Sequence, residues 1–230
     1  MGKGIFVAAT GTDIGKTYVT ALIIKKLCEA GYKAGYYKAA LSGAETIGNE
    51  LVPGDVDYVK TIAKLSCDCA EMVSYVYKTA VSPHLAAKLE GNPVNLEKII
   101  NDYKMQCAKY DYVVVEGSGG IICPIRYDEE AEIFLEDIIK ALGLDVIIVA
   151  DAGLGTINST LLTVKYLKSK NIAIKGIMLN RYHGGIMEDD NVKMIEKLSG
   201  IPVIALVAEG ASDVDIDADT LKRIFEKDEK

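Results

Sequence analysis

Short runs of apolar residues alternate along this chain with longer stretches in which apolar residues recur every three or four positions. The short runs predict β-strands, and several of them, such as 113–115 and 146–149, are unbroken apolar sequences. Unbroken runs are typical of parallel strands that are covered on both faces. The predicted strands span residues 4–9, 33–38, 112–116, 145–150, 173–179 and 202–206.

The longer periodic stretches predict α-helices between these strands. The predicted helices span residues 19–30, 56–65, 96–110, 134–142, 160–169 and 191–198, with a further short helix in the acidic tail 213–230. Regular alternation of strand and helix predicts an α/β fold with a doubly wound, mostly parallel sheet and helices on both faces. Because no repeat, low-complexity tract or linker interrupts the pattern, we expect one domain over residues 1–230.

The composition narrows the classes of protein to which the chain can belong. Half of the 230 residues are hydrophobic, yet no run of about 18 apolar residues predicts a membrane span. We expect no signal segment, because no basic and then apolar stretch precedes the first predicted strand. A net charge of −7 argues against general nucleic-acid binding. The five cysteines are scattered, which favours free thiols in a reducing cytoplasm. We therefore expect a cytoplasmic protein with no membrane or nucleic-acid partner.

The loop between the first strand and the first helix carries the strongest chemical signal. Residues 10–17 read Thr-Gly-Thr-Asp-Ile-Gly-Lys-Thr, and a Gly-rich loop that ends in Gly-Lys-Thr at this position is typical of a nucleotide phosphate site. Gly15 allows close backbone approach, Lys16 brings positive charge to the phosphates, and the Thr17 hydroxyl is placed to bind Mg²⁺. The usual motif has its first glycine where this chain has Thr10. The alternative is an ordinary strand–turn–helix unit with incidental glycines.

Charged residues follow two other predicted strands, at the edge where ligands bind in such sheets. Lys38 ends the second strand and is placed either to stabilise charge on a phosphoryl group or to reach solvent. Glu116 ends the third strand before the glycines of 117–120, which favours a carboxylate near Mg²⁺ over a plain turn. Asp55 and Asp57 begin the next helix, where either is a second candidate metal carboxylate or simply favours the helix N-terminus.

Three further turn segments carry polar residues whose roles stay open. His84, in the Ser-Pro-His sequence at 82–84, is either a substrate ligand or a packed loop residue. The turn at 151–158 contains two glycines before a helix and is suited to hold a carboxylate or to make a turn. Asn180 ends the fifth strand and offers the donor and acceptor that reading an adenine edge requires.

Together these segments resemble the dethiobiotin synthetase family, the ATP-dependent enzymes of biotin synthesis. They occur in the order typical of that family and span nearly the whole chain. The segments that carry the resemblance are Asp13-Ile14-Gly15-Lys16-Thr17, Lys38 with Ser42-Gly43, Ser82-Pro83-His84, Val115-Glu116-Gly117-Ser118-Gly119-Gly120, Gly153-Leu154-Gly155-Thr156-Ile157-Asn158, and Asn180.

The resemblance implies a P-loop NTPase fold, a homodimer, and ATP with Mg²⁺ as cofactors. It implies that Lys38 and Lys16 are the catalytic lysines and that Thr17, Asp55 and Glu116 surround the metal. The implied ATP-side residues are Asp13, Ile14, Gly15, Lys16, Thr17, Tyr18, Asp55, Glu116, Gly117, Ser118, Gly119, Asn180, Arg181, Ala208, Glu209 and Gly210. The implied substrate-side residues are Ser42, Ser82, Pro83, His84 and, from the neighbouring subunit, Gly155, Thr156, Ile157 and Asn158.

The reaction implied by the resemblance joins carbon dioxide to 7,8-diaminopelargonic acid and closes a ureido ring through a carbamic-phosphoric anhydride. A nucleotide-switched partition or positioning ATPase of the same fold is the alternative. Such an ATPase tends to carry a basic C-terminal surface and a lysine early in the loop, whereas this chain has an acidic tail and Gly-Thr-Asp at 11–13. A related amide-forming synthetase is a third reading, but the chain is too short to add a glutaminase domain.

Overall fold

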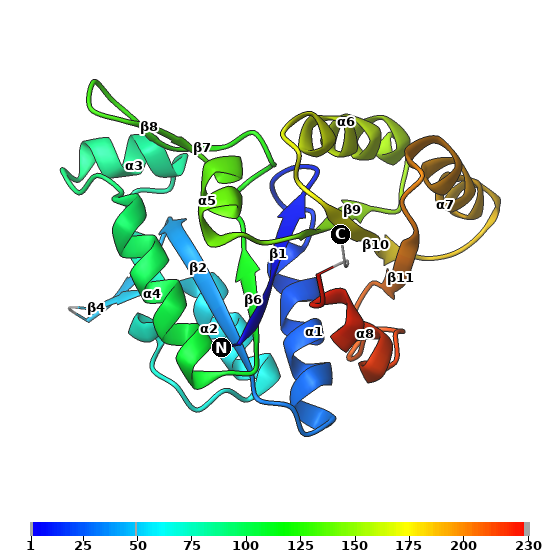
Figure 1. Ribbon diagram of the computed structural model, residues 1–230, viewed down its shortest axis with the longest axis horizontal. Coiled ribbons are helices and arrows are strands. Elements are labelled where there is room, and N and C mark those ends of the chain that lie inside the picture. The colour runs from blue at the N-terminus through cyan, green and yellow to red at the C-terminus, as the bar shows by residue number, and fades with distance from the viewer. Residues whose placement is uncertain (1, 49, 228–230) are drawn as a thin grey trace.

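A seven-stranded sheet forms the centre of the structure, a computed structural model that describes residues 2–48 and 50–227. Every pair of neighbouring strands in it is parallel, and the order across the sheet is β11-β10-β9-β1-β6-β2-β5. Figure 1 shows β1 near the middle of the view, with β6 and β2 on one side and β9 to β11 on the other. The strands are β1 (Lys3–Ala9), β2 (Ala34–Ser42), β5 (Val73–Tyr77), β6 (Tyr112–Glu116), β9 (Val146–Asp151), β10 (Ile174–Tyr182) and β11 (Val203–Ala208).

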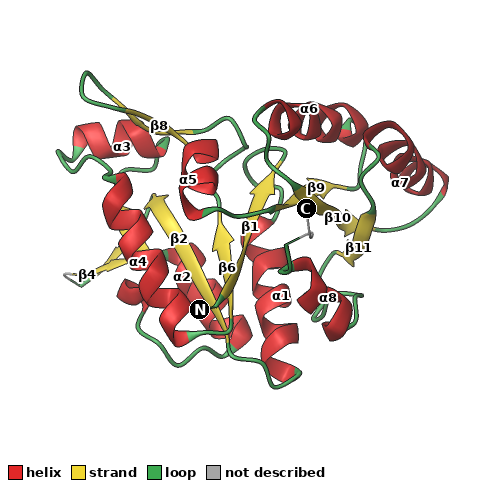
Figure 2. Cartoon of the chain, viewed as in Figure 1, coloured by secondary structure: helices red, strands yellow, loops and turns green. Residues whose placement is uncertain are grey.

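Helices cover both faces of the sheet, and each face has its own hydrophobic core (Figure 2). Side chains alternate along β1, so Phe6 points into one core while Ile5 and Val7 point into the other. The core around Ile5 and Val7 is closed by α1 (Lys16–Glu29), α2 (Gly54–Ala63) and α8 (Ala218–Ile224). The core around Phe6 is closed by α3 (Pro83–Leu89), α4 (Leu96–Lys109), α5 (Leu135–Leu142), α6 (Thr156–Ser169) and α7 (Ile186–Ser199).

The order of the strands indicates at which edge of the sheet a ligand would bind. From β1 the chain passes beyond the position of β6 to form β2 and β5, returns to β6, and then crosses to β9 on the other side of β1. Such a reversal of direction creates a crevice beyond the carboxyl ends of the strands, where α/β proteins bind ligands. The loops that follow β1, β2, β6 and β10 therefore meet at one edge.

The predicted fold class is confirmed, since all six predicted strands belong to the parallel sheet and helices lie on both faces. The predicted helices are also present, and three of them begin three to five residues earlier than their apolar periodicity indicates. α1 begins at Lys16, α6 at Thr156 and α7 at Ile186, because the first turn of each carries polar or glycine-flanked residues that contribute little to the apolar stripe.

One strand of the main sheet and two small hairpins differ from the elements that the sequence predicts. β5 reads Val-Ser-Tyr-Val-Tyr, forms the sheet edge, and alternates buried with half-buried residues, so it lacks the unbroken apolar run of the central strands. The hairpins are antiparallel and have strands of three or four residues: β3 (Glu45–Ile47) with β4 (Glu50–Val52), and β7 (Pro124–Tyr127) with β8 (Glu132–Phe134). A short 3₁₀ turn, η1 (Cys69–Glu71), precedes β5.

Other expectations concern the tail, the cysteines and the membrane. In the tail 213–230, α8 buries Leu221 and Ile224 against the core while the acidic side chains stay exposed, and residues 228–230 lie outside the described residues. All five cysteines are free thiols. Within the described ranges, no helix combines the length and apolar character needed to cross a membrane.

Candidate active site

The turn between β1 and α1 depends on two residues with left-handed backbone conformation. Asp13 has φ of 57° and Gly15 has φ of 89°. Gly15 occupies the N-cap position without a side-chain cap, so the first N–H groups of α1 remain available to a ligand. A Cβ atom added to Gly15 would lie 2.1 Å from Asn180 Nδ2, which excludes a larger residue here. Both the conformation and the contact therefore require glycine.

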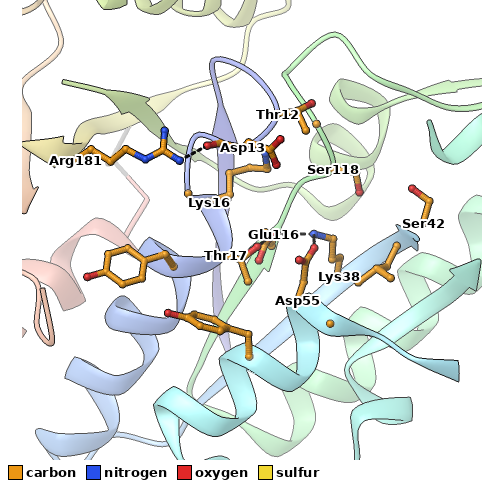
Figure 3. A pocket seen from close by; sticks show the side chains of 16 residues that line it. Thr12, Asp13, Lys16, Thr17, Lys38, Ser42, Asp55, Glu116, Ser118 and Arg181 are labelled. Atoms are coloured by element: carbon orange, nitrogen blue, oxygen red, sulfur yellow. Dashed lines mark hydrogen bonds and ion pairs between the residues drawn. The ribbon is translucent and has the colours of Figure 1, made fainter. Parts of the chain in front are cut away.

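A cavity of about 650 Å³ opens at this turn, beyond the carboxyl ends of β1, β2 and β6. Its size is within the range of small-molecule and cofactor sites. Figure 3 shows side chains from the loop on one side facing Lys38 and Asp55 on the other. The lining residues are Thr12, Asp13, Gly15, Lys16, Thr17, Tyr18, Lys38, Leu41, Ser42, Gly54, Asp55, Tyr58, Glu116, Ser118, Gly119 and Arg181.

A charged network joins four elements, α1, α2, β2 and β6, at the floor of this cavity. Lys38 Nζ lies 2.7 Å from Glu116 Oε1 and 2.5 Å from Asp55 Oδ2. The Thr17 hydroxyl donates to the same Glu116 oxygen at 2.8 Å. The Lys38 and Glu116 side chains are almost completely buried, whereas that of Asp55 is 41% exposed. The network therefore places two carboxylates, an ammonium group and a hydroxyl beside the phosphate loop.

The second carboxylate oxygen of Glu116 accepts a hydrogen bond from a buried tyrosine on β2. Tyr36 lies two residues before Lys38 on the same face of β2, and its hydroxyl donates to Glu116 Oε2 at 2.9 Å. Burial, followed by the nearby Glu116 and Asp55 carboxylates, raises the pKa of Tyr36 well above its ordinary value. Tyr36 therefore stays protonated and keeps donating to Glu116.

Burial and neighbouring charges shift the pKa values of the two lysines in opposite directions. Burial lowers the pKa of Lys16, and the nearby Lys38 lowers it further. Burial alone would lower the pKa of Lys38, but Glu116 and Asp55 outweigh it and raise the pKa above its ordinary value. Burial would raise the pKa of Asp55, but Lys38 outweighs it and lowers that pKa. Lys38 and Asp55 are therefore both charged at neutral pH.

The donor set of this network fits a hard divalent cation. Thr17, Asp55 and Glu116 supply a hydroxyl and two carboxylates, which are oxygen ligands of the kind that Mg²⁺ prefers. The described part of the chain contains no cluster of three or more His, Cys, Asp or Glu side chains suited to hold a metal. Two carboxylates suffice for Mg²⁺ when substrate phosphates and waters complete its coordination. Asp57, the other candidate on α2, is exposed and outside the cavity lining.

Several predicted site residues lie outside the lining of this cavity. Ile14 and Gly117 flank it, and the carbonyl of Ile14 accepts a hydrogen bond from Asn180 Nδ2 at 2.9 Å. Asn180 is buried, and its Oδ1 has no hydrogen-bond partner among the described atoms, as is also true of His84 Nδ1. The remaining segments are 82–84 at the start of α3, 155–158 at the start of α6, and 208–210 at the end of β11.

The structure also brings in residues that the sequence analysis did not single out. Thr12, Leu41, Gly54 and Tyr58 line the cavity, and Tyr36 supports Glu116 from outside it. For two of these residues, the sequence spacing from a candidate site residue could have indicated a role in the site. Tyr58 lies three residues after Asp55 on a predicted helix, and Tyr36 lies two before Lys38 on a predicted strand, so each shares a face with a candidate residue.

Comparison with known proteins gives relatives over the whole chain and a wider group that shares the fold. A family model described as an AAA domain matches residues 3–212. The protein named ATP-dependent dethiobiotin synthetase BioD from Brachyspira hyodysenteriae is 52% identical over 98% of this chain and 100% of its own length. The protein of the same name from Clostridium botulinum is 49% identical over 98% of this chain and 99% of its own length.

Solved structures with the same fold are much more distant in sequence. A ParA family ATPase from Chlorobium tepidum has a TM-score of 0.57 at 15% identity, covering 98% of this chain and 89% of that chain. The septum site-determining protein MinD from Pyrococcus horikoshii, described as complexed with Mg-ADP, has a TM-score of 0.55 at 17% identity, covering 98% and 95%. At such identities the likeness shows the fold alone.

Proposed function

This chain belongs to the family of ATP-dependent dethiobiotin synthetases, and we propose that its cavity carries out their ring-closing ligation in biotin biosynthesis. The substrates would be ATP, carbon dioxide and 7,8-diaminopelargonic acid. The observation that carries the proposal is the position of Lys38, a buried ammonium group between two carboxylates, across the cavity from the phosphate loop. We further propose that one domain holds the whole site and that it works in the cytoplasm.

The phosphates of ATP would lie on the loop that ends at Gly15. The uncapped start of α1 lines the cavity, so its first N–H groups would be available to phosphate oxygens, and Lys16 adds a positive charge there. Lys16 Nζ now donates to the carbonyl of Gly11 at 3.2 Å, so it lies across its own loop, where phosphates would rest. This arrangement supports a role in which Lys16 binds the β- and γ-phosphates.

Thr17, Asp55 and Glu116 would hold Mg²⁺ together with phosphate oxygens. The ion would neutralise charge on the transferred phosphoryl group. Tyr36 would keep Glu116 in position through its hydrogen bond to Oε2. Because Lys38 contacts both carboxylates, its ammonium group is also placed to offset negative charge beside the metal site.

The proposed reaction needs no covalent nucleophile from the chain. One amine of the substrate attacks carbon dioxide and loses a proton, which gives a carbamate. A carbamate oxygen attacks the γ-phosphorus and ADP leaves, which gives a carbamic-phosphoric anhydride. The second amine attacks the carbonyl carbon and loses a proton, inorganic phosphate leaves, and the ureido ring closes. Positioning and charge stabilisation by Lys16 and Lys38 would supply most of the catalysis.

Segments around the cavity would bind the adenine base of ATP and the diamine substrate. Asn180, with its buried Oδ1 free to accept a hydrogen bond, supports an adenine contact, and Arg181 and 208–210 would complete that side. Ser42 lines the cavity on the substrate side, next to which we place 82–84. These assignments follow the resemblance to the family.

We propose that the enzyme is a homodimer in which residues 155–158 of one subunit bind the substrate carboxylate in the site of the other. Two observations support this. The segment begins α6 outside the cavity lining of its own chain. Leu154 just before it is 92% exposed, so this turn presents an apolar side chain to its surroundings. The competing partition-ATPase function has support at the level of the fold alone.

An isotope experiment tests the proposed chemistry. The carbamate oxygen that attacks phosphorus originates from carbon dioxide and leaves with phosphate. Single-turnover reaction with ¹⁸O-labelled bicarbonate in unlabelled water is expected to yield phosphate that carries one ¹⁸O atom. Phosphate that takes its new oxygen from water instead would contradict the proposal, because it would show direct hydrolysis of ATP.

A further inference from the structure

Arg181 connects two segments that the proposed function assigns to different ligands. Its Nη2 donates to the carbonyl oxygen of Asp13 in the phosphate loop at 2.6 Å, as Figure 3 shows. Its Nη1 lies 3.1 Å from Asp151 Oδ2 at the end of β9. One planar guanidinium group thus bridges the loop before α1 and the turn before α6, which is a geometry that Arg supports and Lys does not.

Both ends of the contact between Arg181 and Asp13 have left-handed backbone conformation. In the described ranges four non-glycine residues have positive φ: Asp13, Lys64, Asn171 and Arg181. Lys64 directly follows α2 and Asn171 lies two residues after the end of α6, where this conformation is a common way to end a helix. Asp13 and Arg181 are not at helix ends, and they are joined to each other by a hydrogen bond. Strained backbone of this kind persists at functional sites.

Side-chain hydrogen bonds from two residues fix the turn after β9. Asp151 Oδ1 accepts from the N–H of Gly153 at 2.8 Å, while its other oxygen faces Arg181. Asn191, buried on α7, donates to the carbonyls of Ala152 and Gly153 at 2.9 Å and 3.2 Å. These bonds orient the chain just before Gly155, which begins α6 without a side-chain cap. Asp151 is therefore one of two side chains that hold the backbone just before the first N–H groups of α6.

We propose that Arg181 is a positioning residue that joins the phosphate loop to the turn before α6 through Asp151, so that nucleotide binding strengthens binding of the substrate carboxylate. A nucleotide that orders the loop fixes the carbonyl of Asp13, and this favours the Arg181 orientation that holds Asp151. A turn that is already ordered loses less freedom when it binds a carboxylate. By linkage the diamine substrate would strengthen nucleotide binding by the same factor.

This inference rests on the proposed function, which gives residues 155–158 to the carboxylate of the neighbouring subunit. The link would then run from the nucleotide site of one subunit to the substrate site of the other. A purely structural role explains the contact less well. The Arg181 and Asp151 side chains are 45% and 34% exposed, and ion pairs of such exposure add little to global stability.

The test measures diamine affinity by calorimetry with and without Mg²⁺ and a non-hydrolysable ATP analogue. Asp151→Asn keeps an oxygen for Gly153 and removes the charge that faces Arg181. Asp151→Glu restores that charge. The control is Glu226→Gln, which breaks the ion pair with Lys3, also 3.1 Å long and half exposed, at the start of β1 and thus at the opposite edge of the sheet. Wild-type turnover is assayed in parallel.

In the wild type and in Glu226→Gln, the analogue is expected to strengthen diamine binding about fivefold or more. In Asp151→Asn the analogue is expected to strengthen diamine binding less than about twofold. The affinity of this variant for the analogue itself should be unchanged, because Asp151 does not line the cavity. Asp151→Glu is expected to recover part of this strengthening. If the analogue strengthens diamine binding in Asp151→Asn as much as in the wild type, the inference is wrong but the proposed function stands. The same holds if an active wild type shows no strengthening by the analogue. A wild type that neither binds nor converts the diamine would overturn the proposed function as well.

Discussion

Lys38 and Glu116 are register partners on the neighbouring parallel strands β2 and β6, and their charged atoms lie 2.7 Å apart under the phosphate loop. The sheet itself therefore fixes their separation. Both side chains are almost fully buried, so each charge depends on the other to offset its loss of hydration. Catalytic charge and local stability are thus linked at this pair.

Replacing Lys38 tests both roles in one variant. Lys38→Met should lower turnover by about a hundredfold or more, because a charge that stabilises the transferred group is lost. It should also lower the free energy of unfolding by about 3–5 kcal/mol, because Glu116 is left as a buried carboxylate without its cation. Turnover is measured by coupled phosphate release and stability by urea denaturation.

Lys98→Met provides the matched control for this substitution. Lys98 pairs with Asp102 on α4 at 2.5 Å, the same distance as Lys38 to Asp55, but its side chain is 48% exposed. The control should change stability by less than about 1 kcal/mol and leave turnover intact. Wild-type turnover in Lys38→Met would refute the role given to that residue.

Tyr36 should influence metal use without touching substrate. Tyr36→Phe removes the hydrogen bond to Glu116 Oε2 and should raise the Mg²⁺ concentration for half-maximal activity about tenfold. Tyr37→Phe is the control, since this neighbouring buried tyrosine points to the opposite face of β2 and bonds to Ser74 and the carbonyl of Ile99. Equal Mg²⁺ dependence in both variants would show that Tyr36 does not support the metal site.

Gly15→Ala should abolish tight nucleotide binding. The added Cβ would meet Asn180 Nδ2 at 2.1 Å, and the left-handed conformation at φ 89° is unfavourable for alanine. Gly31→Ala isolates the second effect, because Gly31 has φ of 86° and open space around its Cβ position. Gly31→Ala should lose about 1–2 kcal/mol of stability and Gly15→Ala at least as much, but only Gly15→Ala should lose affinity for ATP in a fluorescence titration. Normal affinity in Gly15→Ala would contradict the loop assignment.

The ion pair between Lys38 and Asp55 predicts a direction for acid stability. Lys38 outweighs burial and holds the pKa of Asp55 below its ordinary value. A carboxyl group with a lowered folded pKa adds stability that is complete above its unfolded pKa and is lost as pH falls through the folded one. The stability difference between wild type and Asp55→Asn should therefore be constant near neutral pH and shrink below about pH 4. A difference that grows with acid would show that Lys38 does not govern this carboxylate.

The main sheet could be predicted largely from sequence because its central strands are buried on both faces. Residues 113–115 and 146–149 have no polar position, which few other structures allow. β5 could not be recognised in this way, because an edge strand alternates its burial. The β3–β4 and β7–β8 hairpins are too short for any periodicity to appear.

Strand ends also explain which site residues could be predicted. Lys38 and Glu116 end parallel strands, so topology alone brings them to the edge that holds the phosphate loop. The contacts of Arg181 could not be predicted, because its side-chain direction depends on its own left-handed backbone conformation near the end of β10. Nor could sequence show that Tyr36 reaches Glu116 across the sheet.

The most direct test of the central claim is phosphate release by the wild-type protein with ATP and Mg²⁺, measured with and without 7,8-diaminopelargonic acid and bicarbonate. If Lys38 and the phosphate loop serve phosphoryl transfer to a carbamate, release should require both additions and should equal the dethiobiotin formed. ATP hydrolysis at the same rate without either addition would contradict the account and favour a nucleotide-switched ATPase.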